Sequence, residues 1–164
     1  MEPVTTQQRA AAQAEPLVFK CILLPIDDDF DLSQRAVSLG LMMARLCGAR
    51  LVVLHAIPPF NTLACMSSAM LAATEVEYCD QAIKDSAARL EQVKRLADAA
   101  QVACACHHNF GEHPHEAILG AAAEHRCDLI VMASHGRHGL DKLMLGSETQ
   151  KVLSMSTVPV LVCR

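Results

Sequence analysis

The chain has 164 residues, of which 52% are hydrophobic, and 14 Lys and Arg against 18 Asp and Glu give it a net charge of −4. Its length is typical of one globular domain, because a domain near this size buries roughly 68–70% of its unfolded surface. The absence of a basic run argues against nucleic acid as a partner, and the absence of an apolar run of roughly 20 residues argues against a membrane-spanning helix.

Eight cysteines are spread through the chain. In a small secreted protein such a number is typical of a disulfide framework. The amino terminus, however, lacks the basic segment followed by an apolar one that a secretion signal requires. We therefore expect reduced thiols in a soluble, cytoplasmic protein.

The first half of the chain predicts a flexible arm, two strands and a helix. Residues 1–16 are rich in Gln, Ala and Thr without an apolar period, so we expect a flexible arm before a single domain at 17–164. The apolar run over 19–26 is typical of a strand buried on both faces of a parallel sheet. Asp31 or Ser33 begins a helix that ends at Gly48, and a second strand follows at 51–57. The expected buried face of that helix comprises Leu32, Ala36, Leu39, Met43 and Leu46.

The second half continues the alternation of helices and strands. Residues 60–74 fit no single interpretation, but a long helix is expected over 75–100. Its expected buried face comprises Val76, Ile83, Ala87, Leu90, Val93 and Leu96. A strand at 102–110, a helix from Pro114, a strand at 128–132, a helix from Ser147 and a strand at 158–163 complete the pattern.

This alternation indicates an α/β fold: one doubly wound, parallel sheet of five strands with helices on both faces. The strand orders 2-1-3-4-5 and 3-2-1-4-5 both fit. In either order a ligand binds beyond the carboxyl ends of the strands, beside the first strand, where the winding direction reverses. The second order would place Asp27 opposite the loop that runs from Ala133 to Gly146.

Small residues between the fourth strand and the last helix indicate an anion site. Gly136 and Gly146 have no Cβ and Ala133 has a small side chain, so the backbone there can lie close to a pyrophosphate. The helix that begins at Ser147 adds N–H groups and the positive end of its dipole. Arg137 would add positive charge.

The first loop suits the other end of a nucleotide. The carboxylate of Asp27 would accept hydrogen bonds from ribose hydroxyls or from the amino group of a base. The acidic loop over 27–31 would repel phosphates unless a cation intervened, so the phosphates belong on the glycine side. Neither of the standard nucleotide motifs, Gly-x-x-x-x-Gly-Lys-Ser/Thr or Gly-x-Gly-x-x-Gly, occurs at the first strand.

An ordinary helix start explains the same residues. Ser147 and Gln150 have the spacing of a capping box, in which each side chain satisfies a backbone N–H of the first turn. Gly136 and Gly139 would then only shape a turn. Spacing alone does not decide between this interpretation and an anion site.

Several segments together resemble the universal stress protein family. They are Asp128-Leu-Ile-Val-Met-Ala-Ser-His-Gly-Arg137, the nine residues between Gly136 and Gly146, the following Ser147, and the ending Pro159-Val-Leu-Val. Ile22-Leu-Leu-Pro-Ile-Asp27 and Val53-Leu-His55-Ala56 also match, so the resemblance covers residues 19–164.

The resemblance implies the strand order 3-2-1-4-5, a homodimer joined through the last strand, and ATP as the ligand of the nucleotide-binding branch. Asp27 and Ala56 would line the adenosine end, with Met132 and Ala133 as the wall beneath it. The phosphate cradle would comprise Gly136, Gly146, Ser147, Glu148 and Thr149. Ala133 replaces the first glycine of the family motif, and its methyl group is expected to weaken binding without abolishing it.

His135 lies inside the same motif. It would either face phosphate or, in the interpretation that we favour, hydrogen-bond its own loop.

Other polar residues suggest alternatives that we weighed. Cys104, Cys106 and His108 alternate along a strand and would share one face, but their spacing matches no zinc pattern, so metal binding is not our interpretation. Cys21, Cys47, Cys127 and Cys163 fall in apolar segments and are interpreted as packing residues.

The sequence therefore predicts a homodimeric stress-response protein that binds ATP, with Mg²⁺ as an accompanying ion, and acts through a nucleotide-dependent conformation or partner contact. No residues form a recognisable set for catalysing phosphoryl transfer, so hydrolysis would at most be slow. One alternative is an ATP hydrolase with a cation on the acidic loop. Another is an interaction module that has lost the nucleotide.

Overall fold

The computed structural model describes residues 19–28, 30–60, 68–134 and 145–164, and it leaves the side chains of Leu32 and residues 68–73 undescribed. The predicted flexible arm at 1–16 lies outside these ranges, so it stays a prediction. Among the helices in the described part of the chain, none is long and apolar enough to cross a membrane.

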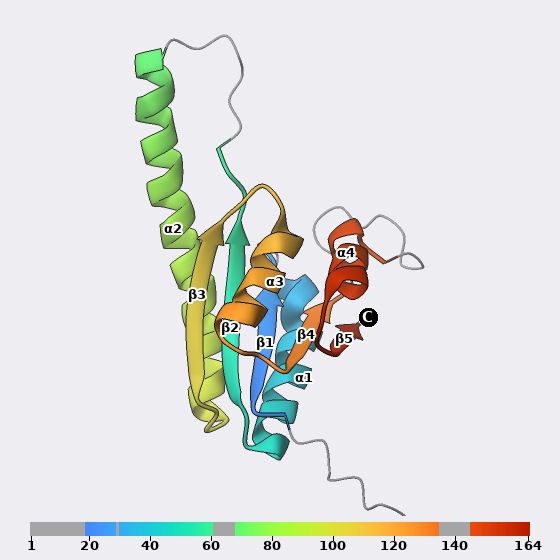
Figure 1. Ribbon diagram of the computed structural model, residues 1–164. Helices are drawn as coiled ribbons and strands as arrows, with labels where there is room; N and C mark the ends of the chain where they lie inside the picture. Colours follow the sequence, from blue (N-terminus) through green and yellow to red (C-terminus); the bar gives the residue numbers. More distant parts are fainter. Residues whose placement is uncertain (1–18, 29, 61–67, 135–144) are drawn as a thin grey trace, which may run out of the picture.

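Five parallel strands form one sheet in the order β3-β2-β1-β4-β5, which confirms the second of the two strand orders (Figure 1). The strands are β1 (Cys21–Ile26), β2 (Arg50–Ile57), β3 (Cys104–Phe110), β4 (Leu129–Ala133) and β5 (Val160–Cys163). The helices between them are α1 (Phe30–Cys47), α2 (Ser68–Ala99), α3 (Pro114–Glu124) and α4 (Ser147–Met155).

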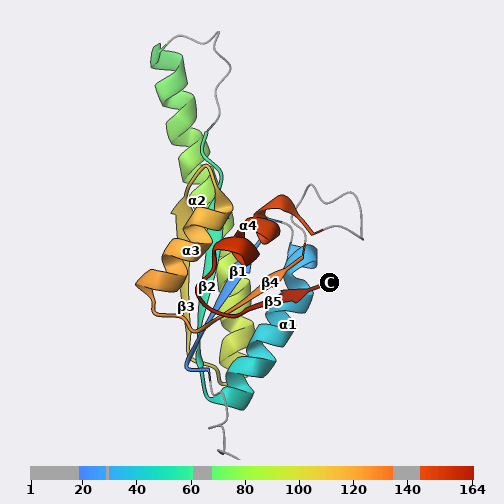
Figure 2. The same ribbon diagram turned by 45° about the vertical axis from the view of Figure 1, so that its right-hand side comes forward.

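The helices cover both faces of the sheet, as the two views of Figures 1 and 2 show, so the predicted three-layer arrangement is confirmed. Side chains of α1 and α2 pack with Ile22, Leu24 and Ile26 on one face. Side chains of α3 and α4 pack with Cys21 and Leu23 on the other face. Because β1 is buried on both sides, its sequence is an unbroken apolar run with no polar alternation.

The buried face of α1 differs from the predicted one. Ala36 is buried as predicted and Met43 packs against the core, but Leu46 is 78% exposed, and the fully buried residues form a stripe shifted from the predicted one. That stripe comprises Ser33, Ala36, Val37, Gly40 and Ala44. The helix begins at Phe30, so Ser33 does not cap it; the Ser33 hydroxyl instead accepts a hydrogen bond from the N–H of Asp27 at 2.9 Å. Gly48 ends the helix as predicted, with a φ of +64°.

Helix α2 begins at Ser68, within the segment that the sequence left open. Among its described side chains, the buried ones are Ser86, Leu90, Val93 and Ala97. The predicted face was therefore wrong in part, since Val76 is 62% and Leu96 43% exposed. Val76 belongs to the amino-terminal half of α2, and this half extends past the carboxyl ends of the strands (Figure 1).

The central strand pairs unequally with its two neighbours. From Cys21 to Ile26, β1 pairs with β2, but its register with β4 comprises only Ile22 with Leu129 and Leu23 with Ile130. Beyond Leu23 these two strands do not pair. The position where the winding direction reverses is therefore unpaired at the carboxyl end of β1.

Candidate functional site

A cleft of about 370 Å³ lies beyond this unpaired part, between the carboxyl ends of β1 and β4 and the first turns of α3 and α4. Its volume falls in the usual range for small-molecule sites, roughly 300–1,000 Å³. Eight of the residues selected from the sequence line it: Asp27, Ala56, Met132, Ala133, Gly146, Ser147, Glu148 and Thr149. The other three, His135, Gly136 and Arg137, lie outside the described residues.

The two ends of the cleft differ in chemistry. Ile26, Leu54, Ile118 and Met132 give it an apolar floor, and Asp27 lies at its edge. Gly146 and the first turn of α4 form the opposite side. The cleft therefore joins an apolar surface beside a carboxylate to a helix amino terminus.

Helix α4 begins with backbone N–H groups that no helical carbonyl accepts. Gly146 is the residue before the first turn, and its own N–H donates to the Ser134 carbonyl at 2.9 Å. Ser147, Glu148 and Thr149 form the first turn, in which an α-helix supplies no acceptor for the N–H groups. The Thr149 hydroxyl lies 3.3 Å from the Ala133 carbonyl oxygen and 3.2 Å from that of Ser134, which ties the helix to the end of β4.

The alternative of a capping box, which the sequence left open, is not what Ser147 and Gln150 form. Among the residues that the structure describes, no side chain caps the amino terminus of α4. The Gln150 amide donates to the Leu145 carbonyl at 2.7 Å and does not reach back to the start of the helix. The described side chains thus leave the first-turn N–H groups available on the side of the cleft.

The carboxylate of Glu148 has a structural partner that sequence reasoning missed. It accepts hydrogen bonds from the His115 backbone N–H at 2.9 Å and from Lys151 at 2.9 Å, and it lies 2.7 Å from the His115 ring Nδ1. Burial raises the pKa of Glu148, but these hydrogen bonds outweigh burial and lower the pKa to about 2. The carboxylate caps α3 and joins it to α4, so only the Glu148 N–H is left for the predicted phosphate cradle.

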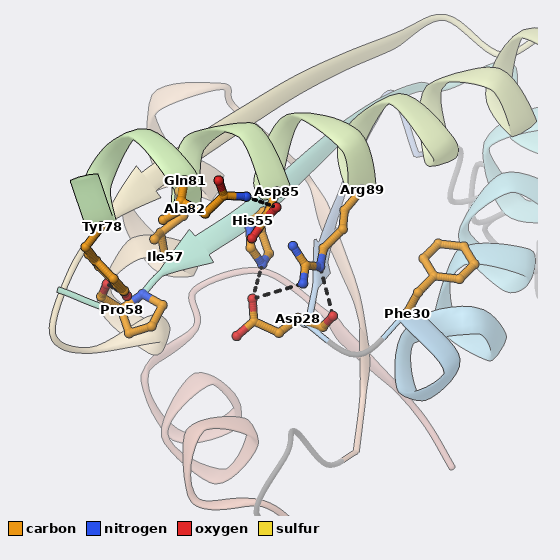
Figure 3. Close-up of a pocket in the computed structure, with 10 residues that line it drawn as sticks. All are labelled: Asp28, Phe30, His55, Ile57, Pro58, Tyr78, Gln81, Ala82, Asp85 and Arg89. Carbon is orange, nitrogen blue, oxygen red and sulfur yellow. Dashed lines mark hydrogen bonds and ion pairs between the residues drawn. The ribbon is translucent and has the colours of Figure 1, made fainter. Parts of the chain in front are cut away.

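Asp27 and Asp28 both line the cleft, and Asp28 also borders a second cavity of about 510 Å³ beside α2 (Figure 3). There the Asp28 carbonyl accepts a hydrogen bond from Arg89 Nε at 2.8 Å. Asp28 Oδ1 lies 3.2 Å from His55 Nε2 and 3.9 Å from an Arg89 nitrogen.

His55 is buried beneath this cluster. Its Nδ1 lies 3.0 Å from the Ser86 hydroxyl. Asp28, His55 and Ser86 have the residue types of a hydrolase triad, but Ser86 is 0% exposed, so no substrate reaches its hydroxyl. The cluster holds the loop after β1 against α2. Two features of the sequence could have indicated this cluster. They are a histidine inside an apolar strand, and Ser86 and Arg89 three residues apart on one helix.

The stability of the fold should depend on the protonation of His55. Burial lowers its pKa from the ordinary 6.5, against the opposing charge of Asp28. The unfolded chain therefore takes up this proton first, and the free energy of unfolding should fall as the pH decreases below about 6.5, until the lower pKa of the folded state is passed. Urea unfolding at several pH values should show a shallower decrease for His55→Gln than for the unmodified chain.

A matched control is His107→Gln. Partial desolvation also lowers the pKa of His107, although most of this side chain is exposed on β3. We expect its replacement to change the pH dependence less than His55→Gln does. An equal or larger change would contradict the role given to His55.

Comparison with known proteins places this arrangement in a family. The model of the universal stress protein family matches residues 19–164. The chain belongs to the universal stress protein family. It is 33% identical to a universal stress protein of Thermus aquaticus over 150 residues, which are 90% of this chain and all of the relative.

Solved universal stress proteins share the fold. One from Lactobacillus plantarum has a TM-score of 0.77 at 22% identity, over 88% of this chain and 97% of its own. Another, described as a complex with cAMP, has a TM-score of 0.64 at 22% identity, over 90% of this chain and 98% of its own.

Cys104 and Cys106 share one face of β3 in this universal stress protein, as predicted, with Sγ atoms 3.9 Å apart. Across the described ranges, no group of three or more His, Cys, Asp or Glu side chains is arranged to hold a metal ion. The pair packs beside Leu90 of α2, whose carbonyl is 3.7 Å from the Cys106 sulfur.

Proposed function

We propose that the cleft binds ATP and that this universal stress protein acts through a nucleotide-dependent conformation or partner contact. One observation carries the proposal: the first-turn N–H groups of α4 lie on the same cleft as Asp27 and an apolar floor. A helix amino terminus attracts phosphate through its N–H groups and its dipole. A related protein described with cAMP supports an adenine nucleotide.

The fit can be followed along the ligand. The phosphates would accept hydrogen bonds from the N–H groups of Ser147, Glu148 and Thr149. The adenosine end would lie between Ala56 and Met132, and the Asp27 carboxylate would accept from ribose hydroxyls or the base amino group. Ala133 presents a methyl group at the cleft, which we expect to lower the affinity without blocking the site.

Mg²⁺ and a second subunit belong to the same proposal. Mg²⁺ usually keeps several water ligands and binds through substrate phosphates plus one or two carboxylates, so it needs no cage of protein side chains.

Homodimerisation would use β5, an edge strand of the sheet whose four residues are all half-buried. A strand edge offers unpaired backbone groups for a partner.

The donor role of α4 can be tested by removing one N–H. Ser147 occupies the first helical position, where proline is well accepted, and Gly146 before it has φ −57° and ψ 148°, which suits a residue preceding proline. Ser147→Pro deletes that donor, and loss of one hydrogen bond to a charged oxygen should lower the ATP affinity about tenfold. Isothermal titration calorimetry measures this change.

Ser147→Ala is the matched control, because it removes the hydroxyl and keeps the N–H. We expect its ATP affinity to stay close to that of the unmodified chain. Equal affinities for Ser147→Pro and the unmodified chain, with both folded by circular dichroism, would reject phosphate binding at this helix.

A further inference from the structure

Two buried thiols lie in contact at the amino ends of the central strands. Cys21 begins β1, Cys127 precedes β4, and their Sγ atoms are 3.2 Å apart. Their exposed fractions are 3% and 5%. All the described cysteines are free thiols. Sequence reasoning treated these two only as packing residues, separated by most of the chain.

The sheet itself sets this contact. Asp128 donates its N–H to the Cys21 carbonyl at 2.9 Å, and the Asp128 carboxylate accepts from the Cys21 N–H at 3.1 Å and the Lys20 N–H at 2.8 Å. Ile22 is in register with Leu129, and Cys127 lies two residues before β4, so the two cysteines are neighbours across the start of two adjacent parallel strands. Such strands lie about 4.8 Å apart, within the separation that a disulfide spans. The two sulfurs would need to approach by about 1.2 Å to reach bonding distance.

The other close pair has a less suitable geometry. Cys104 and Cys106 are two residues apart on one strand, with sulfurs 3.9 Å apart. Two such residues are separated by about 6.6 Å along the strand, and their side chains stand side by side. A disulfide requires Cβ atoms about 3.5–4.5 Å apart, so bridging Cys104 and Cys106 would distort β3. This pair is therefore a control for proximity without suitable backbone geometry.

We propose that Cys21 and Cys127 form a reversible disulfide that fastens β1 to β4 at the end of the sheet opposite the cleft. The oxidant is a low-molecular-weight disulfide, such as oxidised glutathione. One cysteine thiolate attacks a sulfur of the oxidant, forms a mixed disulfide and releases one small thiol. The second cysteine then attacks the mixed disulfide and releases the other small thiol, so two cysteine thiols are oxidised and one external disulfide is reduced to two thiols.

Burial controls the rate of this exchange. Desolvation, together with the contact with Cys21, raises the pKa of the Cys127 thiol to about 12. Because the thiolate is the nucleophile, exchange is slow while the fold is closed and proceeds when the amino ends of β1 and β4 open transiently. Mild denaturant should therefore accelerate oxidation of the pair, and refolding in a redox buffer should form the bond directly.

The bond would add a connection where the sheet has few. The register between β1 and β4 comprises only two residue pairs, directly beside Cys21. A disulfide between positions 21 and 127 closes most of the chain into one loop, and long loops give large stabilisation in the chain-entropy account. The oxidised protein should therefore melt at a higher temperature than the reduced protein, by about 5 °C or more.

The test is to incubate the full chain with oxidised and reduced glutathione in a urea concentration below its unfolding transition, then alkylate free thiols and map peptides by mass spectrometry. We expect one peptide pair linked through Cys21 and Cys127, lighter by two hydrogen atoms, and a melting temperature that reductant lowers. Cys127→Ala should lose both effects. Cys104→Ala combined with Cys106→Ala should keep both.

Peptide mapping of the unmodified chain does not depend on whether a variant folds. Alkylation of both Cys21 and Cys127 after oxidation, or a link between other cysteines in their place, would overturn the proposal. A linked pair whose reduction leaves the melting temperature unchanged would contradict the claim that the bond fastens the two strands.

Discussion

Replacing Ala56 with phenylalanine should weaken ATP binding by roughly a hundredfold, which corresponds to about 2.8 kcal/mol of binding free energy. Ala56 is half-buried at the carboxyl end of β2, and its side chain lines the cleft. A ring at this position would occupy the space between the apolar floor and Asp27, where we place the adenosine. Calorimetry with ATP measures the loss.

The matched control is Ala105→Phe. Ala105 is an exposed residue of β3 and does not line the cleft, and the same side chain is introduced there on the adjacent strand. We expect unchanged affinity. If Ala56→Phe still binds ATP as tightly as Ala105→Phe, the nucleotide does not lie in this cleft.

Removing the Glu148 carboxylate should destabilise the fold by about 2 kcal/mol, an amount that allows for partial screening by solvent. The carboxylate joins the backbone and ring of His115 to Lys151, so Glu148→Ala leaves the start of α3 without its acceptor. Lys151→Ala removes only one exposed partner and should cost about 0.5 kcal/mol. Urea unfolding at neutral pH compares the two variants.

The same carboxylate gives a signature in acid. Its pKa is about 2 in the fold against an ordinary value of 4.5, so its contribution to stability is complete above about pH 4.5 and is lost as the pH falls through about 2. Glu148→Gln should show a smaller decrease in unfolding free energy between these values than the unmodified chain. Identical slopes would show that the hydrogen bonds of Glu148 do not favour its ionised form.

The sequence predicted the architecture because local signals and burial agree along most of the chain. Gly48 and Pro114 mark helix boundaries through fixed backbone preferences, and β1 is apolar at every position that the sheet buries. The faces of α1 and α2 were less predictable, because Leu46 and Val76 fit a helical period yet extend beyond the core. Periodicity describes a helix alone and not the sheet beneath it.

The site was predictable to a different degree. Strand order brings Asp27 and the start of α4 to one cleft, and that order followed from the family resemblance, since alternation alone left two orders. The contacts of Glu148 with His115 and of Asp28 with Arg89 join residues distant in sequence, so no local sequence pattern predicts them. The capping box does not form because the Gln150 amide donates to the Leu145 carbonyl instead of reaching the start of the helix.

Because the register between β1 and β4 is short, a bound ligand would affect how firmly the two parts of the sheet are held together. Strands β3, β2 and β1 form one paired block and β4 with β5 another. The register between the blocks comprises two residue pairs, beside which the Asp128 N–H donates to the Cys21 carbonyl. A nucleotide held by Asp27 on the first block and by α4 on the second would bridge them at their open end. Binding would then make separation of the two blocks less favourable. A partner that binds one relative orientation of the blocks more tightly than another would therefore respond to the nucleotide without contacting it.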